Sequence, residues 1–251
     1  MFGLFKKKEE SLEEILKSNY LHAFSNIDKR NWDLVLSVSL GLIFPAQYAF
    51  SLLFEEEDSD WEVDMKKGKI YIGSQNYDIQ FIGSQSNVDN TWLWGWENIN
   101  AYKEEIVANI NYVNRVGQAW ENPVLTQPMQ KVGTNTYDHA FASVACALTK
   151  EPVIYFACPH DKGTAMVMIV NPPSQVFDPI PMERFMGLVT NGISEYDLDH
   201  ALYIESILYG QNISYEWKDD LTLLAKFDKN LYINFKLEGQ EYLVDTMSFE
   251  N

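Results

Sequence analysis

The stretch TWLWGWEN, Thr91 to Asn98, places a tryptophan at every second position three times in succession. Side chains alternate between the two faces of an extended strand, so Trp92, Trp94 and Trp96 would share one face. Each indole buries on the order of 150–250 Å², and burial contributes ~25 cal/mol per Å² of apolar surface. We therefore expect a strand that buries its tryptophans in the core, where a sheet meets helices.

The same stretch has an alternative interpretation as a binding surface. Three aromatic side chains on one face would form a groove for a flat or apolar ligand or for a partner's side chain, with Glu97 and Asn98 at its mouth. A polar side chain such as His139 would then add hydrogen bonding to an apolar pocket. The candidate ligand- or partner-binding residues are Trp92, Trp94, Trp96, Glu97, Asn98 and His139.

Short apolar runs on both sides of this stretch predict an antiparallel sheet. The expected strands lie at residues 61 to 65, 69 to 73, 77 to 82, 152 to 158 and 164 to 170. Turn residues at Lys67-Gly68 and Gln75-Asn76 join the first three strands into a meander, and the sequence PHDKG joins the last two into a hairpin. The tryptophan strand would extend this sheet.

Helical spacing of apolar residues predicts the elements that cover the sheet. Ser11 and Glu14 form a capping-box pattern at the start of a helix over 11 to 26. Asn100 is placed to cap a second helix that ends near Gly117. An alanine-rich third helix is expected between the second helix and the hairpin.

The run Leu34 to Phe54 contains no charged side chain and follows Lys29 and Arg30, so its length permits a membrane span. Serine, glycine, proline and glutamine residues dilute its hydropathy, and its first half alternates with period two. Pro45 is suited to the first position of a helix. We therefore expect a buried strand or helix, then a second helix from Pro45, and no membrane span, with this run as the only caution.

The C-terminal third begins with a proline-rich segment. Four prolines between Asn171 and Pro181 predict a linker or a long ordered crossover. Ser194 and Asp197 are spaced to cap a helix that ends at Gly210. Strands are expected at residues 213 to 217, 221 to 227, 231 to 237 and 241 to 248.

These elements predict an α+β fold in which antiparallel sheets pack against amphipathic helices. The expected domains are residues 1-175, which include the N-terminal helices, and residues 176-251, a smaller C-terminal α-β-β-β module. The alternative is that the module packs as part of the same domain.

Acidic residues dominate the charge of the chain. Thirty-six Asp and Glu residues against 19 Lys and Arg residues give a net charge of −17, which would repel nucleic acid phosphates and anionic lipid headgroups. The same charge would attract a basic protein partner, and it is also a common route to solubility. The two cysteines, Cys146 and Cys158, lie in apolar segments, which favours buried thiols in a reducing cytoplasm.

Two groups of residues contain the side chains of a catalytic or metal-binding site but lack the spacing that such a site requires. Cys158 and His160 could pair as nucleophile and base, but one residue of a tight turn separates them and no oxyanion-hole motif accompanies them. Asp197, Asp199 and His200 carry metal-ligating groups, but successive helical residues point in different directions. We therefore expect no catalytic residue, no metal and no cofactor, and favour a protein that is not an enzyme.

The stretch TWLWGWEN, together with the strands before it and the hairpin after it, resembles an uncharacterised bacterial family of unknown function. That family is marked by an LGS-type turn, a TWLWAWAN-type strand and a late glycine-rich hairpin, and the resemblance covers Trp61 to Val170. Gly95 and Glu97 stand where alanines are usual, and PHDKG replaces a run of glycines. The resemblance implies a soluble, cytoplasmic protein and brings no catalytic residues.

These observations lead to two hypotheses on function. The first is a non-enzymatic soluble protein that binds an unknown, basic protein partner through an acidic surface, as an immunity or regulatory protein would. The second is an enzyme or small-molecule binder whose pocket lies beside the strand of Trp92, Trp94 and Trp96. Complete burial of these tryptophans with no adjoining cavity would remove the sequence support for the second hypothesis.

Overall fold

The computed structural model describes residues 10–16, 19–54, 60–132, 137–239 and 241–249. Within them the chain forms an α+β fold in which helices pack against a seven-stranded and a four-stranded sheet. The described strand pairs of both sheets are antiparallel. The predicted fold class is therefore confirmed.

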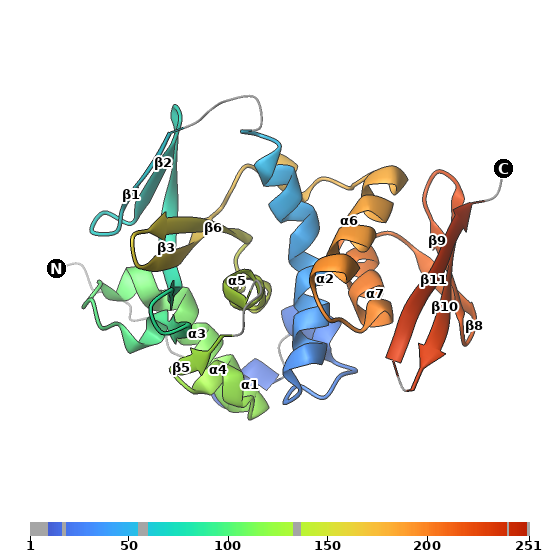
Figure 1. Cartoon of the computed structure of the whole chain (residues 1–251), viewed down its shortest axis with the longest axis horizontal. Helices are drawn as coiled ribbons and strands as arrows, with labels where there is room; N and C mark the ends of the chain where they lie inside the picture. Colours follow the sequence, from blue (N-terminus) through green and yellow to red (C-terminus); the bar gives the residue numbers. More distant parts are fainter. Residues whose placement is uncertain (1–9, 17–18, 55–59, 133–136, 240, 250–251) are drawn as a thin grey trace.

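The helix α2 (Trp32–Ser51) runs through the middle of the molecule, with the larger sheet on one side and α6, α7 and the smaller sheet on the other (Figure 1). Asn31 caps it, because its side-chain oxygen accepts hydrogen bonds from Asp33 N at 2.9 Å and Leu34 N at 3.4 Å. The prediction of a second helix starting at Pro45 is wrong, since Pro45 lies inside one continuous helix. The period-two pattern was misleading because α2 is buried on most sides, so its apolar residues follow no single stripe.

α2 packs closely against α7 (His200–Gly210). The small residues that lower the hydropathy of α2 permit this close approach. A Cβ added at Gly41 would lie 2.4 Å from the carbonyl oxygen of Tyr203, so glycine permits this close crossing. The Ser37 hydroxyl accepts a hydrogen bond from Asp199 N at 3.0 Å. By length and composition α2 could cross a membrane, and 61% of its apolar window is buried inside the fold. Much of its apolar surface is therefore used for packing within this chain.

The larger sheet is organised around the long strand β3 (Gln75–Ser86). Its other strands are β1 (Trp61–Asp64), β2 (Lys69–Ile72), β4 (Thr91–Trp94), β5 (Met129–Lys131), β6 (Val153–His160) and β7 (Gly163–Val170). β3 pairs with β2, with β4 and with β7, and β7 also pairs with β6 in the predicted hairpin. The predicted turn at Gln75-Asn76 is wrong by two residues. The chain turns at Gly73 and Ser74, because Gly73 adopts the positive φ, 54°, that this turn requires.

The tryptophan stretch is a strand for only half of its length. β4 ends at Trp94, and Gly95–Glu97 form a short 3-10 helix, η2, so Trp96 leaves the strand. Trp96 stacks on Trp94 instead, with ring centroids 4.7 Å apart and an interplanar angle of 17°. The chain bends at Gly95, which lies so close to β3 that a Cβ there would be 2.7 Å from the carbonyl oxygen of Ile82.

The remaining helices before β6 are α1 (Leu12–Leu16), the 3-10 helix η1 (Asn19–Phe24), α3 (Glu104–Trp120), α4 (Pro123–Thr126) and α5 (Tyr137–Ala147). α3 and α5 pack against strands of the larger sheet, α1 and α4 pack against α3, and η1 lies against α2. The predicted capping box is confirmed, since Glu14 N donates to Ser11 Oγ at 3.2 Å and Ser11 N donates to Glu14 Oε2 at 2.6 Å. The predicted helix over 11 to 26 is wrong in length, because α1 ends at Leu16 and the chain resumes as a 3-10 helix; residues 17–18 lie outside the described residues.

The predicted bounds of α3 are also wrong at both ends. Ala101 has a φ of 51°, which breaks the helical path after Asn100, so α3 begins only after Lys103. Gly117 does not end the helix, because it is a packing residue: a Cβ there would lie 2.5 Å from the Cβ of Leu125. The helix continues for three more residues.

The C-terminal third contains a helix, α6 (Met182–Glu195), that was not predicted. Ser194 lies inside α6, so the predicted cap by Ser194 and Asp197 is wrong. Asp199 caps α7 instead, and its carboxylate accepts a hydrogen bond from Leu202 N at 2.9 Å. The remaining elements are the 3-10 helix η3 (Ser174–Phe177), β8 (Tyr215–Asp219), β9 (Thr222–Lys226), β10 (Asn230–Glu238) and β11 (Glu241–Phe249). The four strands form the smaller sheet in the order β11-β10-β9-β8.

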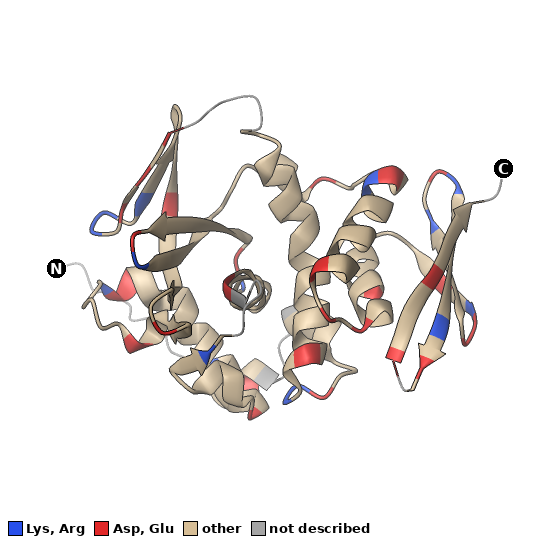
Figure 2. Cartoon of the chain, in the orientation of Figure 1, with Lys and Arg blue, Asp and Glu red and all other residues tan. Residues whose placement is uncertain are grey.

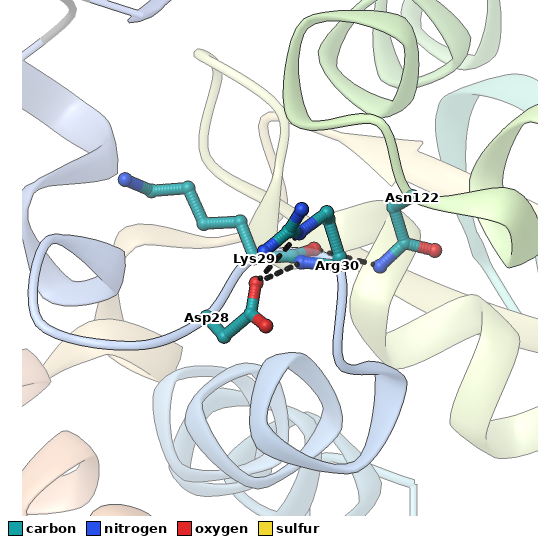
Figure 3. A network of polar contacts seen from close by, with 4 residues as sticks. All are labelled: Asp28, Lys29, Arg30 and Asn122. Carbon is teal, nitrogen blue, oxygen red and sulfur yellow. Dashed lines mark hydrogen bonds and ion pairs between the residues drawn. The ribbon is translucent and has the colours of Figure 1, made fainter.

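Asn122 joins the loop before α2 to the corner between α3 and α4 (Figure 3). Its Nδ2 donates to the Lys29 carbonyl at 2.8 Å, and its Oδ1 accepts from Val124 N at 3.0 Å to cap α4. Beside it, hydrogen bonds from the backbone and side chain of Arg30 hold the pKa of the Asp28 carboxyl below its usual range. Asn122 is fully buried, so these bonds fix the position of α2 against the larger sheet's helices.

Candidate functional site

The tryptophans predicted as binding residues lie mainly in the core. Trp92 and Trp94 are 0% and 1% exposed, and Trp96 is half-buried. The ring of Trp92 stacks on Phe141 of α5 at 5.1 Å, and Trp94 Nε1 donates to the Val124 carbonyl at 2.9 Å. The strand therefore packs the larger sheet onto α5.

The two polar residues at the end of this stretch shape the loop before α3. Glu97 is exposed. Asn98 turns back on the chain, because its Oδ1 accepts from Tyr102 N and its Nδ2 donates to the Tyr102 carbonyl, both at 2.8 Å. Its φ of 45° is a left-handed conformation that asparagine tolerates better than most residues.

His139, the last of the predicted binding residues, lies in a different place. It lines a cleft of about 510 Å³ between α2, α5, β6 and α6, which we name the α2–α6 cleft. None of the tryptophans of TWLWGWEN lines this cleft. Its volume falls within the range of about 300–1,000 Å³ that small-molecule sites occupy. The residues on which its chemistry depends are Gln47, His139, Tyr155, Asn191, Glu195 and Tyr196.

A backbone clamp fixes one side of the α2–α6 cleft. In the described part of the chain β6 pairs only with β7, so the peptide groups on its other edge need partners. Gln47 of α2 supplies both for Tyr155: its Nε2 donates to the Tyr155 carbonyl at 2.9 Å, and its Oε1 accepts from Tyr155 N at 3.1 Å. The glutamine amide takes the place of a neighbouring strand and ties α2 to the edge of the sheet.

His139 and Tyr155 form a polar pair inside the cleft. His139 Nδ1 lies 3.1 Å from Tyr155 Oη, and Tyr155 is only 5% exposed. Burial raises the pKa of the Tyr155 phenol far above its usual range, so the phenol keeps its proton.

α6 forms the opposite wall, and Tyr203 of α7 supports it from behind. Tyr203 is 0% exposed, and its Oη donates to the Leu188 carbonyl at 2.9 Å. A Cβ added at Gly192 would lie 2.3 Å from this Oη, so the glycine leaves the room that the phenol fills. Phe44 of α2 contacts the rings of Tyr196 and Tyr203 edge-on, at 5.8 and 6.2 Å. Buried packing therefore holds this wall in place.

The charges around the cleft have opposite signs at its two ends. Glu195 lines the cleft, and the pKa of Tyr196 is raised by burial first and then by the negative charges of Glu195 and Asp138. Arg184 lies over the ring of Tyr48 at 4.7 Å, beside a neighbouring hollow of about 330 Å³. Since Arg184 and Glu195 both lie on α6, the helical rise separates them by about 16 Å along its axis.

Neither cysteine has the environment of a nucleophile. Both are free and buried, and burial raises the pKa of Cys158 to about 12 and that of Cys146 further still. A thiol with a raised pKa is protonated at neutral pH and reacts poorly. His160 is exposed, and its Nδ1 accepts a hydrogen bond from Lys162 N at 3.3 Å.

The acidic residues beside His200 also have structural partners. Asp199 caps α7, and His200 Nδ1 accepts a hydrogen bond from Val244 N of β11 at 2.9 Å. Burial lowers the pKa of His200, although Asp199, Asp197 and Glu241 act in the opposite direction. Among the residues that the structure describes, no group of three or more His, Cys, Asp or Glu side chains is placed to hold a metal ion.

Most residues of the cleft carried no local signal in the sequence. Gln47 and Tyr155, which the clamp joins, are 108 positions apart, and the α6 residues follow a proline-rich segment. One signal was present: Gln47 is the single amide side chain in the uncharged run Leu34 to Phe54. A buried amide in apolar surroundings requires hydrogen-bond partners, so it marks a contact with another element's backbone.

Comparison with known proteins gave one family match. No curated protein and no solved structure matches the chain. Residues 33–173, more than half of the 251 residues, match a family described as a family of unknown function. The match starts at α2, earlier than the resemblance from Trp61 onward, and includes the tryptophan stretch. The chain therefore belongs to the family of unknown function DUF6882.

Proposed function

We propose that this chain is a non-enzymatic binding protein that holds a small, flat, largely apolar molecule in the α2–α6 cleft. The observation that carries the proposal is the lining of a cleft of about 510 Å³ by Phe and Tyr rings together with a few polar side chains. Aromatic walls provide the apolar contact area, and a small number of polar groups fixes the orientation of a ligand.

The polar groups of the cleft are suited to binding. Burial raises the pKa of both Tyr155 and Tyr196, so both phenols stay neutral at physiological pH. The Tyr155 hydroxyl is bonded to His139, and the Tyr196 hydroxyl can donate a hydrogen bond to a ligand. A general base needs a pKa near the working pH, which these two phenols lack. Asn191 adds an amide that can both donate and accept.

The tryptophan stretch supports this function indirectly. Phe141 of α5 contacts Trp92 at 5.1 Å and Trp94 at 5.4 Å, and the same helix carries His139 two residues earlier. The buried tryptophans therefore position the helix that presents His139, while the ligand itself would meet other residues.

A basic protein partner is a second proposal, supported by the net charge of −17. Figure 2 shows Asp and Glu residues on elements throughout both halves of the chain, a spread that favours general attraction over one defined patch. We further propose a soluble, cytoplasmic, bacterial protein of immunity or regulatory type that does not bind nucleic acid. The two buried free thiols and the resemblance seen in the sequence support these assignments.

A fragment screen by thermal shift tests the small-molecule proposal. Asn191→Trp would place an indole in the cleft, because Asn191 is exposed and lines it. Thr190→Trp is the matched control, because Thr190 is the exposed neighbour on α6 and does not line the cleft. We expect aromatic fragments that raise the melting temperature of the native chain and of Thr190→Trp but not of Asn191→Trp.

Two results would contradict the proposal. Fragments that stabilise Asn191→Trp as well as the native chain bind elsewhere. A screen of several hundred aromatic fragments that yields no stabilising compound would favour the protein-partner proposal, which predicts capture by a basic protein that weakens as salt rises.

A further inference from the structure

We infer that the ligand of the α2–α6 cleft is an organic cation, an alkylated or aromatic ammonium, whose positive group lies at the end formed by Tyr155, Tyr196 and Glu195. This inference rests on the proposed function, since it names the chemical class of molecule that the same cleft would hold. It follows from the rings, the charges and the position of Arg184.

Aromatic rings are the first observation. The cleft is lined by Phe44, Tyr48, Tyr155, Phe156 and Tyr196. The face of each ring carries negative charge from its π electrons, and several such faces around one space form the cage that binds quaternary ammonium groups. An ammonium that carries methyl groups also offers apolar surface to the same rings.

Carboxylates at one end are the second observation. Glu195 lines the cleft, and the negative charge of Asp138 acts on both Tyr155 and Tyr196, whose pKa values it helps to raise. Among the described residues, no Lys or Arg lines this cleft. The potential at the end formed by Tyr155 and Tyr196 is therefore negative, which favours a cation and disfavours a carboxylate or phosphate.

The position of Arg184 is the third observation. Its guanidinium lies 4.7 Å from the centroid of the Tyr48 ring, so a ring of this cleft already interacts with a cation of the chain itself. The same positive charge would repel a second cation at the Tyr48 end. A ligand cation is therefore directed to the other end, next to Glu195.

Two probes of the same shape test this inference: (3-hydroxyphenyl)trimethylammonium and 3-tert-butylphenol, which differ by one positively charged nitrogen in place of carbon. We expect the cation to bind the native chain about tenfold more tightly in isothermal titration calorimetry at low salt, because the rings and Glu195 act on its charge alone.

Matched charge variants locate the effect. Glu195→Gln should lower the affinity for the cation several-fold and leave the affinity for the neutral phenol unchanged. Glu183→Gln removes the same charge from an exposed position in the first turn of α6, outside the cleft, and should change neither affinity.

The outcomes separate the two proposals. Equal affinity for both probes, or a neutral or anionic ligand from the fragment screen, would overturn the cation inference and leave the binding function standing. If Glu183→Gln weakens cation binding as much as Glu195→Gln does, the effect is a long-range one of total charge, and the assignment to this end of the cleft fails. If neither probe binds and the fragment screen is empty, both proposals fail.

Discussion

The tryptophan stretch and the α2–α6 cleft show two ways in which aromatic residues are encoded. The stretch gathers its rings within a few consecutive residues, and its first two indoles are enclosed by protein. The cleft takes its rings from α2, from β6 and from the end of α6, and they line one open space. Aromatic residues that are close together in the sequence therefore indicate the core. The candidate site, in contrast, is formed by residues from segments that are far apart in the sequence.

The largest expected effect is that of Trp94→Ala. The substitution leaves a cavity in the core and should cost about 3–5 kcal/mol of the free energy of unfolding, much of the 5–15 kcal/mol of an ordinary domain. Urea unfolding measures the loss, with Trp61→Ala as control, because Trp61 is 40% exposed and should cost less. An unchanged urea midpoint for Trp94→Ala would mean that the stretch is a surface, and the comparison above would be reversed.

Gln47→Ala tests the contribution of the cleft to the free energy of unfolding. It removes both hydrogen bonds to the Tyr155 backbone, and we expect a loss of about 2 kcal/mol. Gln118→Ala is the matched control, since Gln118 is exposed and bonds only to Asn114 among the contacts described, so its loss should stay within about 0.5 kcal/mol. Equal losses for the two variants would show that the clamp contributes nothing.

A smaller effect distinguishes the two buried tryptophans from each other. Trp94 Nε1 donates to the Val124 carbonyl, whereas Trp92 Nε1 has no hydrogen-bond partner in the described structure. Trp94→Phe should therefore cost about 1 kcal/mol more than Trp92→Phe, because both lose ring volume and only one loses a hydrogen bond. Equal urea midpoints would indicate that the Trp94 bond adds no net stability.

The smallest expected effect lies outside both regions, where α7 meets the smaller sheet. The pKa of His200 is lowered below its ordinary value of 6.5 by burial, so folding favours the neutral ring. Its contribution to stability is complete above pH 6.5 and is lost as the pH falls from there through the lowered pKa of the folded state. Urea midpoints measured from pH 7.5 to 5 should fall less steeply for His200→Gln than for the native chain. Parallel curves for the two chains would assign the pH dependence to other groups.

The fold class followed from the sequence because hydrophobic period and turn residues are local properties. The capping box of Ser11 and Glu14 and the hairpin of β6 and β7 are examples. The errors arose where tertiary contacts determine the bounds of a helix. α2 is one helix because several elements bury it together, and α3 continues past Gly117 because this glycine packs on Leu125.

The candidate site was less predictable for the same reason. Of its residues the sequence predicts only His139 as a binding residue, in a pocket beside the tryptophans. Its true neighbours depend on the backbone clamp by Gln47 and on α6, a helix that the proline-rich segment before it obscured. No spacing along the chain reports contacts of this kind.

The support of α6 by Tyr203 has a consequence for the kinetics of ligand entry. Because the Leu188 carbonyl is bonded and the space at Gly192 is filled, the wall is in place before a ligand arrives. A ligand then loses its own freedom on binding but does not have to order a helix, which lowers the entropic cost of association. The observed rate constant for binding should rise linearly with ligand concentration, as expected for a preformed site. It should show no plateau, because no slow closing step follows the encounter.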